Sequence, residues 1–187
     1  MTLRYPIAFC LVLLCLRGQA QTVTDSMALF DDGKTQEAVT QLNQLGLGGN
    51  AEAQNMLGVL YDNGQGVAQD YKLARAWFEK AAAQGHASAQ YHLGFMYEAG
   101  RGVAHNDKQA LQWYKLAATA ADPNAQYRLA MLYGYGKYVP QNNTKAFEWL
   151  QKSAHQGYAD AQFTLGLVYG GGLWGVKEDS AAAARWF

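Results

Sequence analysis

The chain has 187 residues, half of them apolar, and its 15 basic residues balance 15 acidic ones. The length would suit one globular domain. The lack of a basic excess argues against nucleic acid or an anionic membrane as the partner.

The first twenty residues have the pattern of a secretory signal peptide. Arg4 precedes the uncharged apolar stretch 7–16, and a small-residue ending, Gly18-Gln19-Ala20, follows. A membrane anchor is the alternative, but ten apolar residues fall short of the ~20 that a spanning helix needs. We therefore expect cleavage after Ala20, a periplasmic or secreted protein, and no membrane span after cleavage. Without this leader, 13 basic and 15 acidic residues remain, a formal charge of −2, and no cysteine is left to form a disulfide.

Residues 21–50 are expected to form an N-terminal capping helix pair. Apolar residues follow helical spacing on both sides of a turn at Asp31-Asp32-Gly33. This segment lacks the motifs that recur downstream, as the end units of repeat arrays usually do.

From residue 51 onward the sequence repeats itself. The pair Ala-Gln occurs at 53, 89, 125 and 161, always 36 residues apart. A fixed period of this size indicates a solenoid, in which each repeat packs only on its neighbours. We divide this part into repeats 51–86, 87–122 and 123–158, and an incomplete fourth repeat, 159–187.

Each repeat is predicted to contain two antiparallel helices. In the first, Ala53, Leu57 and Leu60 share one helical stripe, which ends at Asn63-Gly64. The second helix begins after an Asp or Asn that can cap its N-terminus, and a tryptophan follows seven residues later. The predicted caps of these second helices are Asp70, Asn106, Asn142 and Asp179, and the tryptophans are Trp77, Trp113, Trp149 and Trp186. In the fourth repeat this register needs one inserted residue in the loop 170–175.

Small and large residues recur at fixed positions of the repeat. Gly58, Gly94, Ala130 and Gly166 would let helix backbones approach closely, while the tryptophans would cover ~150–250 Å² of apolar surface each. We expect these tryptophans to hold the scaffold together.

The motif resembles the Sel-1-like repeat, a relative of the tetratricopeptide repeat. The first two repeats carry it most clearly, as AEAQNMLGVLYDNGQGV and ASAQYHLGFMYEAGRGV. The third departs at Ala130 and at Tyr138, which replaces the second glycine of the loop. The resemblance implies an all-α, right-handed α-solenoid that acts as an adaptor. It also implies, as alternatives, a periplasmic immunity protein against a secreted toxin or a β-lactamase-like hydrolase. The relatives linked to β-lactams are cysteine-rich, whereas this chain has no cysteine after residue 20. The hydrolase alternative is therefore not supported.

The sequence lacks the common motifs for catalysis and metal binding. Gly33-Lys34-Thr35 lacks the first glycine of a phosphate loop, and neither Ser-x-x-Lys nor Gly-x-Ser-x-Gly occurs. The loop that starts at Asp62 has Leu73 where a calcium loop needs glutamate. No two histidines have the i, i+4 spacing of metal ligands. We expect no enzyme, no cofactor and no metal.

The resemblance also implies where a protein or peptide partner would bind. In the tetratricopeptide repeat, the first helix lines the concave face with the positions two before, two after and five after a conserved leucine. Carried onto this chain, with Tyr135 added from the next position, the predicted partner-binding residues are Asn55, Val59, Asp62, Tyr91, Phe95, Glu98, Tyr127, Met131, Tyr135, Phe163 and Leu167. The alternative is that superhelical curvature buries this stripe as core.

The sequence ends at Trp186-Phe187, halfway through the expected last helix. We expect either a longer array or an apolar end covered by a partner or by a second copy in a homo-oligomer.

Overall fold

The computed structural model describes residues 22–187, in which ten α-helices and one 3-10 turn follow one another without a strand. The expected leader lies outside these residues. The helices are α2 (Val23–Asp31), α3 (Thr35–Leu47), α4 (Ala51–Asn63), α5 (Tyr71–Ala83), α6 (Ala87–Ala99), α7 (Asp107–Thr119), α8 (Pro123–Tyr135), α9 (Asn143–His155), α10 (Ala159–Gly171) and α11 (Ser180–Trp186), with η1 (Leu173–Gly175) between the last two. The predicted all-α solenoid is confirmed.

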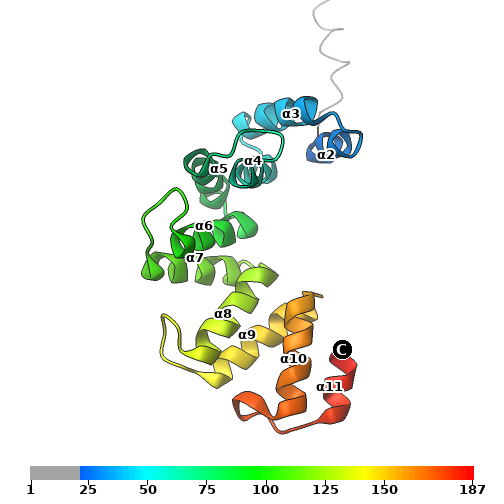
Figure 1. The fold of residues 1–187 in the computed structure, drawn as a ribbon, viewed down its shortest axis with the longest axis vertical. Helices are drawn as coiled ribbons and strands as arrows, with labels where there is room; N and C mark the ends of the chain where they lie inside the picture. Colours follow the sequence, from blue (N-terminus) through cyan, green and yellow to red (C-terminus); the bar gives the residue numbers. More distant parts are fainter. Residues whose placement is uncertain (1–21) are drawn as a thin grey trace, which may run out of the picture.

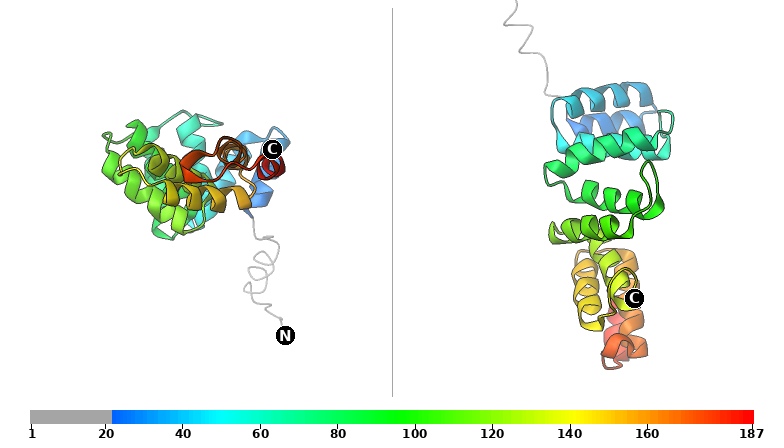
Figure 2. Two further views of the ribbon diagram at one scale, coloured as in Figure 1. Left: turned by 90° about the horizontal axis from the view of Figure 1, so that it is seen from below. Right: turned by 90° about the vertical axis from the view of Figure 1, so that its left-hand side faces the viewer.

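Helices that are adjacent in the chain pack on one another, so the molecule extends in one direction. Successive pairs follow a curved path from α2 at one end to α11 at the other (Figure 1). Figure 2 shows the same array from below (left) and from a further side (right), where the helices stack along its length. The predicted pair at the N-terminus is formed by α2 and α3, and the turn between them contains Gly33 with φ 76°.

The predicted N-caps are confirmed. Asn106 Oδ1 accepts the amide of Gln109 at 3.0 Å, and Asn142 and Asp179 cap α9 and α11 in the same way, while Asp70 accepts two amides of α5. Each cap satisfies a backbone donor that has no partner inside the helix. A histidine also caps a first helix: His86 Nδ1 accepts the amide of Ala89 at 3.3 Å, and its Nε2 lies 2.8 Å from Glu52.

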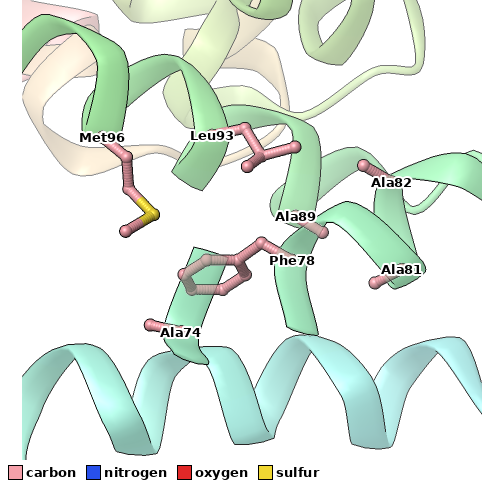
Figure 3. Packing of buried hydrophobic residues seen from close by; sticks show 7 residues of the cluster. All are labelled: Ala74, Phe78, Ala81, Ala82, Ala89, Leu93 and Met96. Atoms are coloured by element: carbon pink, nitrogen blue, oxygen red, sulfur yellow. The ribbon is translucent and has the colours of Figure 1, made fainter. Parts of the chain in front are cut away.

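The core differs from the prediction in which aromatic residue is buried deepest. Trp77 is only 6% exposed, but Trp113, Trp149 and Trp186 are half-buried. The residue after the tryptophan fills the centre of the first three repeats, as Phe78, Tyr114 and Leu150. Figure 3 shows Phe78 in the cluster that joins the first and second repeats. This residue faces the small residue of the preceding helix, so it is packed from both sides.

The inserted residue of the fourth repeat lies where the register placed it. Leu173–Gly175 form η1, and Trp174 takes φ 55°, in the left-handed region. Its ring fills the space beside Gly134, where an added Cβ would come within 2.4 Å of Trp174 Cζ2. The insertion thus ties the fourth repeat back to α8.

Candidate functional site

The first helices of the repeats, α4, α6, α8 and α10, carry all eleven predicted partner-binding residues. Helix α4 contacts α6 and α6 contacts α8 across the repeat boundaries, in addition to the contacts that each makes with its own second helix. Equivalent helices come closest on the inner side of a curved stack, so α4, α6 and α8 line the concave side.

In the first repeat, the predicted residues offer little free surface. Asn55 is 8% exposed, and its Oδ1 is buried without a hydrogen-bond partner. Val59 packs against the core cluster of Phe78, and Asp62 is held by Arg101 at 3.2 Å. Asn55 and Val59 also line a pocket of about 660 Å³ beside α2 and α3, so the binding of a partner by these three residues stays a prediction.

In the second and third repeats, the structure brings four predicted residues together around a pocket of about 210 Å³: Tyr91, Phe95, Glu98 and Tyr127. Tyr114, Asn124, Arg128 and Tyr158 complete its walls and were not anticipated. The rings of Tyr127 and Tyr158 lie 5.4 Å apart, and those of Tyr91 and Tyr114 lie 5.8 Å apart. The pocket is therefore mostly aromatic, with one ion pair on its edge.

That ion pair belongs to the network around Glu98. The carboxylate accepts hydrogen bonds from Tyr114 at 2.7 Å, from Tyr138 at 3.2 Å and from Arg128 Nε at 3.1 Å, and it also pairs with Arg128 Nη2 and Lys137. With only 12% of its side chain exposed, Glu98 is saturated within the protein. Glu98 therefore organises the pocket, and its contact with a partner stays a prediction.

The electrostatics of the network follow from burial and these bonds. Burial alone would raise the pKa of Glu98, but the hydrogen bonds from Tyr114, Arg128 and Tyr138 outweigh it and hold this pKa below its usual value. Burial and the bond to Glu98 raise the pKa of Tyr114, and burial and Asp160 raise the pKa of Tyr158 to about 12. At neutral pH both phenols are therefore protonated donors.

Tyr138 reaches Glu98 from an unusual backbone conformation. It occupies the loop position of Gly66 and Gly102, and it keeps their left-handed φ, at 64°. A non-glycine residue there is strained by roughly 1–3 kcal/mol, and such strain is often found at functional sites. In the sequence, only the replacement of the motif's glycine by Tyr138 indicated that this loop position has a special role.

Toward the C-terminal end, the predicted stripe becomes exposed. Tyr135, Phe163 and Leu167 are 75%, 57% and 46% exposed, whereas Met131 is half-buried in the core cluster of the third and fourth repeats. The ring of Phe163 lies 5.7 Å from that of Phe187, which is itself 69% exposed. Phe163, Leu167 and Phe187 form an apolar surface on and beside α10.

Ionisable groups in the described residues are not arranged as a metal site. Within residues 22–187, no three His, Cys, Asp or Glu side chains gather closely enough to hold an ion. His92 is the histidine with a shifted pKa: burial lowers it, and the nearby Asp122 and Asp62 oppose the shift. Its ring stacks on Phe78 with centroids 4.7 Å apart, a packing role.

Four consecutive segments match the model of the Sel1 repeat, at residues 51–86, 87–122, 123–158 and 159–187. The chain belongs to the Sel1 repeat family. The Sel1 repeat is generally a non-enzymatic scaffold for protein interactions.

Two solved Sel1 structures are similar over most of the chain. A Sel1 repeat protein from Oxalobacter formigenes is 34% identical with a TM-score of 0.80, covering 88% of this chain and 67% of its own. A protective antigen present in uropathogenic Escherichia coli strains is 30% identical with a TM-score of 0.76, covering 94% of this chain but 39% of its own. The chain thus spans about two fifths of the second protein. None of the curated proteins compared with the chain matches it.

No helix in residues 22–187 combines the length and the apolar character that crossing a bilayer requires.

Proposed function

We propose that the protein is a non-enzymatic adaptor that binds a protein or peptide on its concave side, with the pocket around Tyr127 and the apolar surface of α10 as one continuous site. One observation carries the proposal: the seven apolar residues of the predicted stripe from Tyr91 to Leu167 all keep exposed surface, and none of them is buried. A stripe that served only as core would be buried.

The residue types suit this role. Aromatic side chains provide most of the binding energy at protein interfaces when they enter well-packed pockets. Tyr91 and Tyr127 are held by neighbouring rings, and the phenol of Tyr127 lies 3.5 Å from the hydroxyl of Thr164 on the next repeat. Groups fixed in this way lose little conformational freedom on binding.

The chemistry of the partner follows from the same surface. An apolar groove bordered by Arg128 and Lys137 favours a segment with aromatic or aliphatic anchors and an acidic residue nearby. Arg128 and Lys137 pair with Glu98, but 34% and 55% of their side-chain surfaces remain exposed.

A displayed library of random peptides, selected on the purified protein, tests this function. We expect enriched peptides with apolar anchors that bind the wild type and lose at least tenfold in affinity for the variant Phe163→Ala. A matched control, Glu148→Ala on α9, should bind them normally. Peptides that bind the Phe163→Ala variant as well as the wild type would place the binding surface elsewhere.

We also propose that residues 1–20 direct export and are removed after Ala20, so that the adaptor acts in the periplasm or outside the cell. The uncharged stretch 7–16 and the small residues before the cleavage point support this. N-terminal sequencing of the exported protein should begin at Gln21. Recovery of the uncleaved chain from membranes would contradict it.

A further inference from the structure

The glutamine of the repeated Ala-Gln pair makes a buried hydrogen-bond relay in the first and third repeats. Gln54 Nε2 donates to the carbonyl of Gly46 at 2.8 Å, and its Oε1 accepts the side-chain amide of Gln84 at 2.8 Å. In the third repeat, Gln126 donates to Ala118 at 3.2 Å and accepts from Gln156 at 2.8 Å. Each buried amide is thus satisfied as donor and as acceptor.

The second repeat keeps the acceptor but lacks the donor. Gln90 is 8% exposed and donates to the carbonyl of Ala82 at 3.5 Å. The residue thirty positions later, where Gln84 and Gln156 stand, is Ala120. As a result, Oε1 of Gln90 is buried with no hydrogen-bond partner. Such an unmatched buried acceptor is rare in native proteins and calls for a reason.

The missing side chain coincides with a pocket of about 700 Å³. Its walls include Gln90, Ala120, Leu116, Thr119, Gln112 and Lys115. Leu116 is 51% exposed and replaces the lysine of the first and third repeats, where Lys80 and Lys152 lie over the rings of Trp77 and Trp149 at 4.1 and 4.3 Å. The replacement makes this wall apolar.

This pocket is separate from the concave site. Tyr114, which lines the concave pocket, and Leu116 both belong to α7. Residues two positions apart on an α-helix project roughly 200° from each other. The two pockets therefore open on opposite faces of α7.

We infer that this pocket is a second binding site, and that its occupant is a primary carboxamide on a short aliphatic stem: a glutamine side chain presented by a partner polypeptide. The first and third repeats contain this group themselves, with the amide of Gln84 or Gln156 on the same acceptor. An incoming carboxamide would donate to Gln90 Oε1 once the Gln90 side chain turns toward the pocket, while its methylene groups contact Leu116 and Ala120. The exposed ammonium of Lys115 disfavours a cationic side chain and therefore favours the neutral amide over lysine.

Titration of the purified full chain, followed by NMR, tests this site. The probe is N-acetyl-glutamine methylamide, and the matched control is N-acetyl-homoleucine methylamide, which has nearly the same shape but an uncharged end without a donor. We expect saturable shifts of the Gln90 side-chain amide and the Leu116 methyl groups with the glutamine probe. The control should bind at least tenfold more weakly.

Ala120→Gln is the decisive variant, because it supplies the missing donor from within the chain. Residue 120 is exposed at the end of α7, so the fold should tolerate the change. We expect the variant to melt at a higher temperature and to lose the response to the probe. Tyr127→Ala, on the concave side, should keep that response, which separates this site from the proposed function. No saturable shift in the wild type, equal binding of the two probes, or an unchanged response in Ala120→Gln would overturn the inference; with the first result, water alone fills the pocket.

Discussion

The ring of Phe78 lies directly over Gly58: a Cβ at position 58 would come within 2.5 Å of the ring atoms Cδ1 and Cε1. The same relationship joins Gly94 to Tyr114 and Gly166 to Phe187. In the third repeat, where the small residue is Ala130, the facing residue is Leu150 rather than an aromatic one. The repeats thus keep the combined volume of the two positions nearly constant, as close packing requires.

Gly58→Ala should destabilise the protein by about 1–3 kcal/mol, because the added methyl group overpacks the contact with Phe78. The background Phe78→Leu recreates the Ala130 and Leu150 combination. In that background the same change should cost clearly less. Urea denaturation of the four proteins measures the difference, and equal costs in both backgrounds would show that the two positions are not coupled.

Glu98→Gln should lower the free energy of unfolding by about 1–3 kcal/mol at pH 7, because it removes charge-assisted hydrogen bonds from a carboxylate that is 12% exposed. The pKa of Glu98 is lower in the folded protein than in the unfolded chain. The charge of Glu98 therefore stabilises the fold fully at a pH above 4.5, the ordinary pKa of a glutamate. This stabilisation is lost as the pH falls through the lower pKa of the folded protein. The difference in free energy of unfolding between wild type and Glu98→Gln, measured by urea denaturation, should shrink in acid. The control Glu148→Gln should change this free energy little at any pH. A difference between wild type and Glu98→Gln that does not depend on pH would contradict this.

His92 should make the protein less stable in mild acid. Burial holds its pKa below the ordinary 6.5, so the unfolded chain binds a proton at a pH where the folded protein does not. Stability therefore falls as the pH drops below about 6.5 and levels off below the folded pKa. Met56 occupies the equivalent position of the first repeat, so His92→Met is a suitable neutral variant. Its melting temperature should depend less on pH between 7.5 and 5.5; an unchanged dependence would assign the effect to other groups.

Trp77→Ala should cost about 3–5 kcal/mol, since this ring is 6% exposed and belongs to the core cluster of the first repeat. Trp113→Ala should cost less, because Trp113 is half-buried at the edge of its cluster. The repeat pattern alone would assign the two residues the same cost. Urea midpoints with their m-values decide between these expectations, and equal costs would favour the simple repeat pattern.

The repeat period was enough to predict the helices and their caps from the sequence, because both depend on residues close together in the chain. Asp70 and Asn106, for example, cap helices that start at the next residue. The same holds for the insertion near Trp174, which shows as one residue added to the register.

The site could be predicted only in part. Tyr91 and Tyr127 followed from their place in the repeat, but the saturation of Glu98 depends on Arg128, Lys137 and Tyr138, which come from thirty to forty residues away. Periodicity describes what repeats share, whereas this network and the unpaired Gln90 arise where single repeats differ. Burial of Asn55 likewise depends on neighbouring elements that the motif does not describe.

The affinity of one selected peptide for Tyr127→Ala and for Tyr133→Ala tests the central claim most directly. Both tyrosines are half-buried on α8, but only Tyr127 lines the concave pocket. We expect Tyr127→Ala to weaken binding by more than ~1 kcal/mol, about a fivefold rise in Kd, with the fold intact by circular dichroism. Tyr133→Ala should bind as the wild type does. Equal affinity of the two variants, or unfolding of Tyr127→Ala, would contradict a concave binding site and make this stripe part of the scaffold.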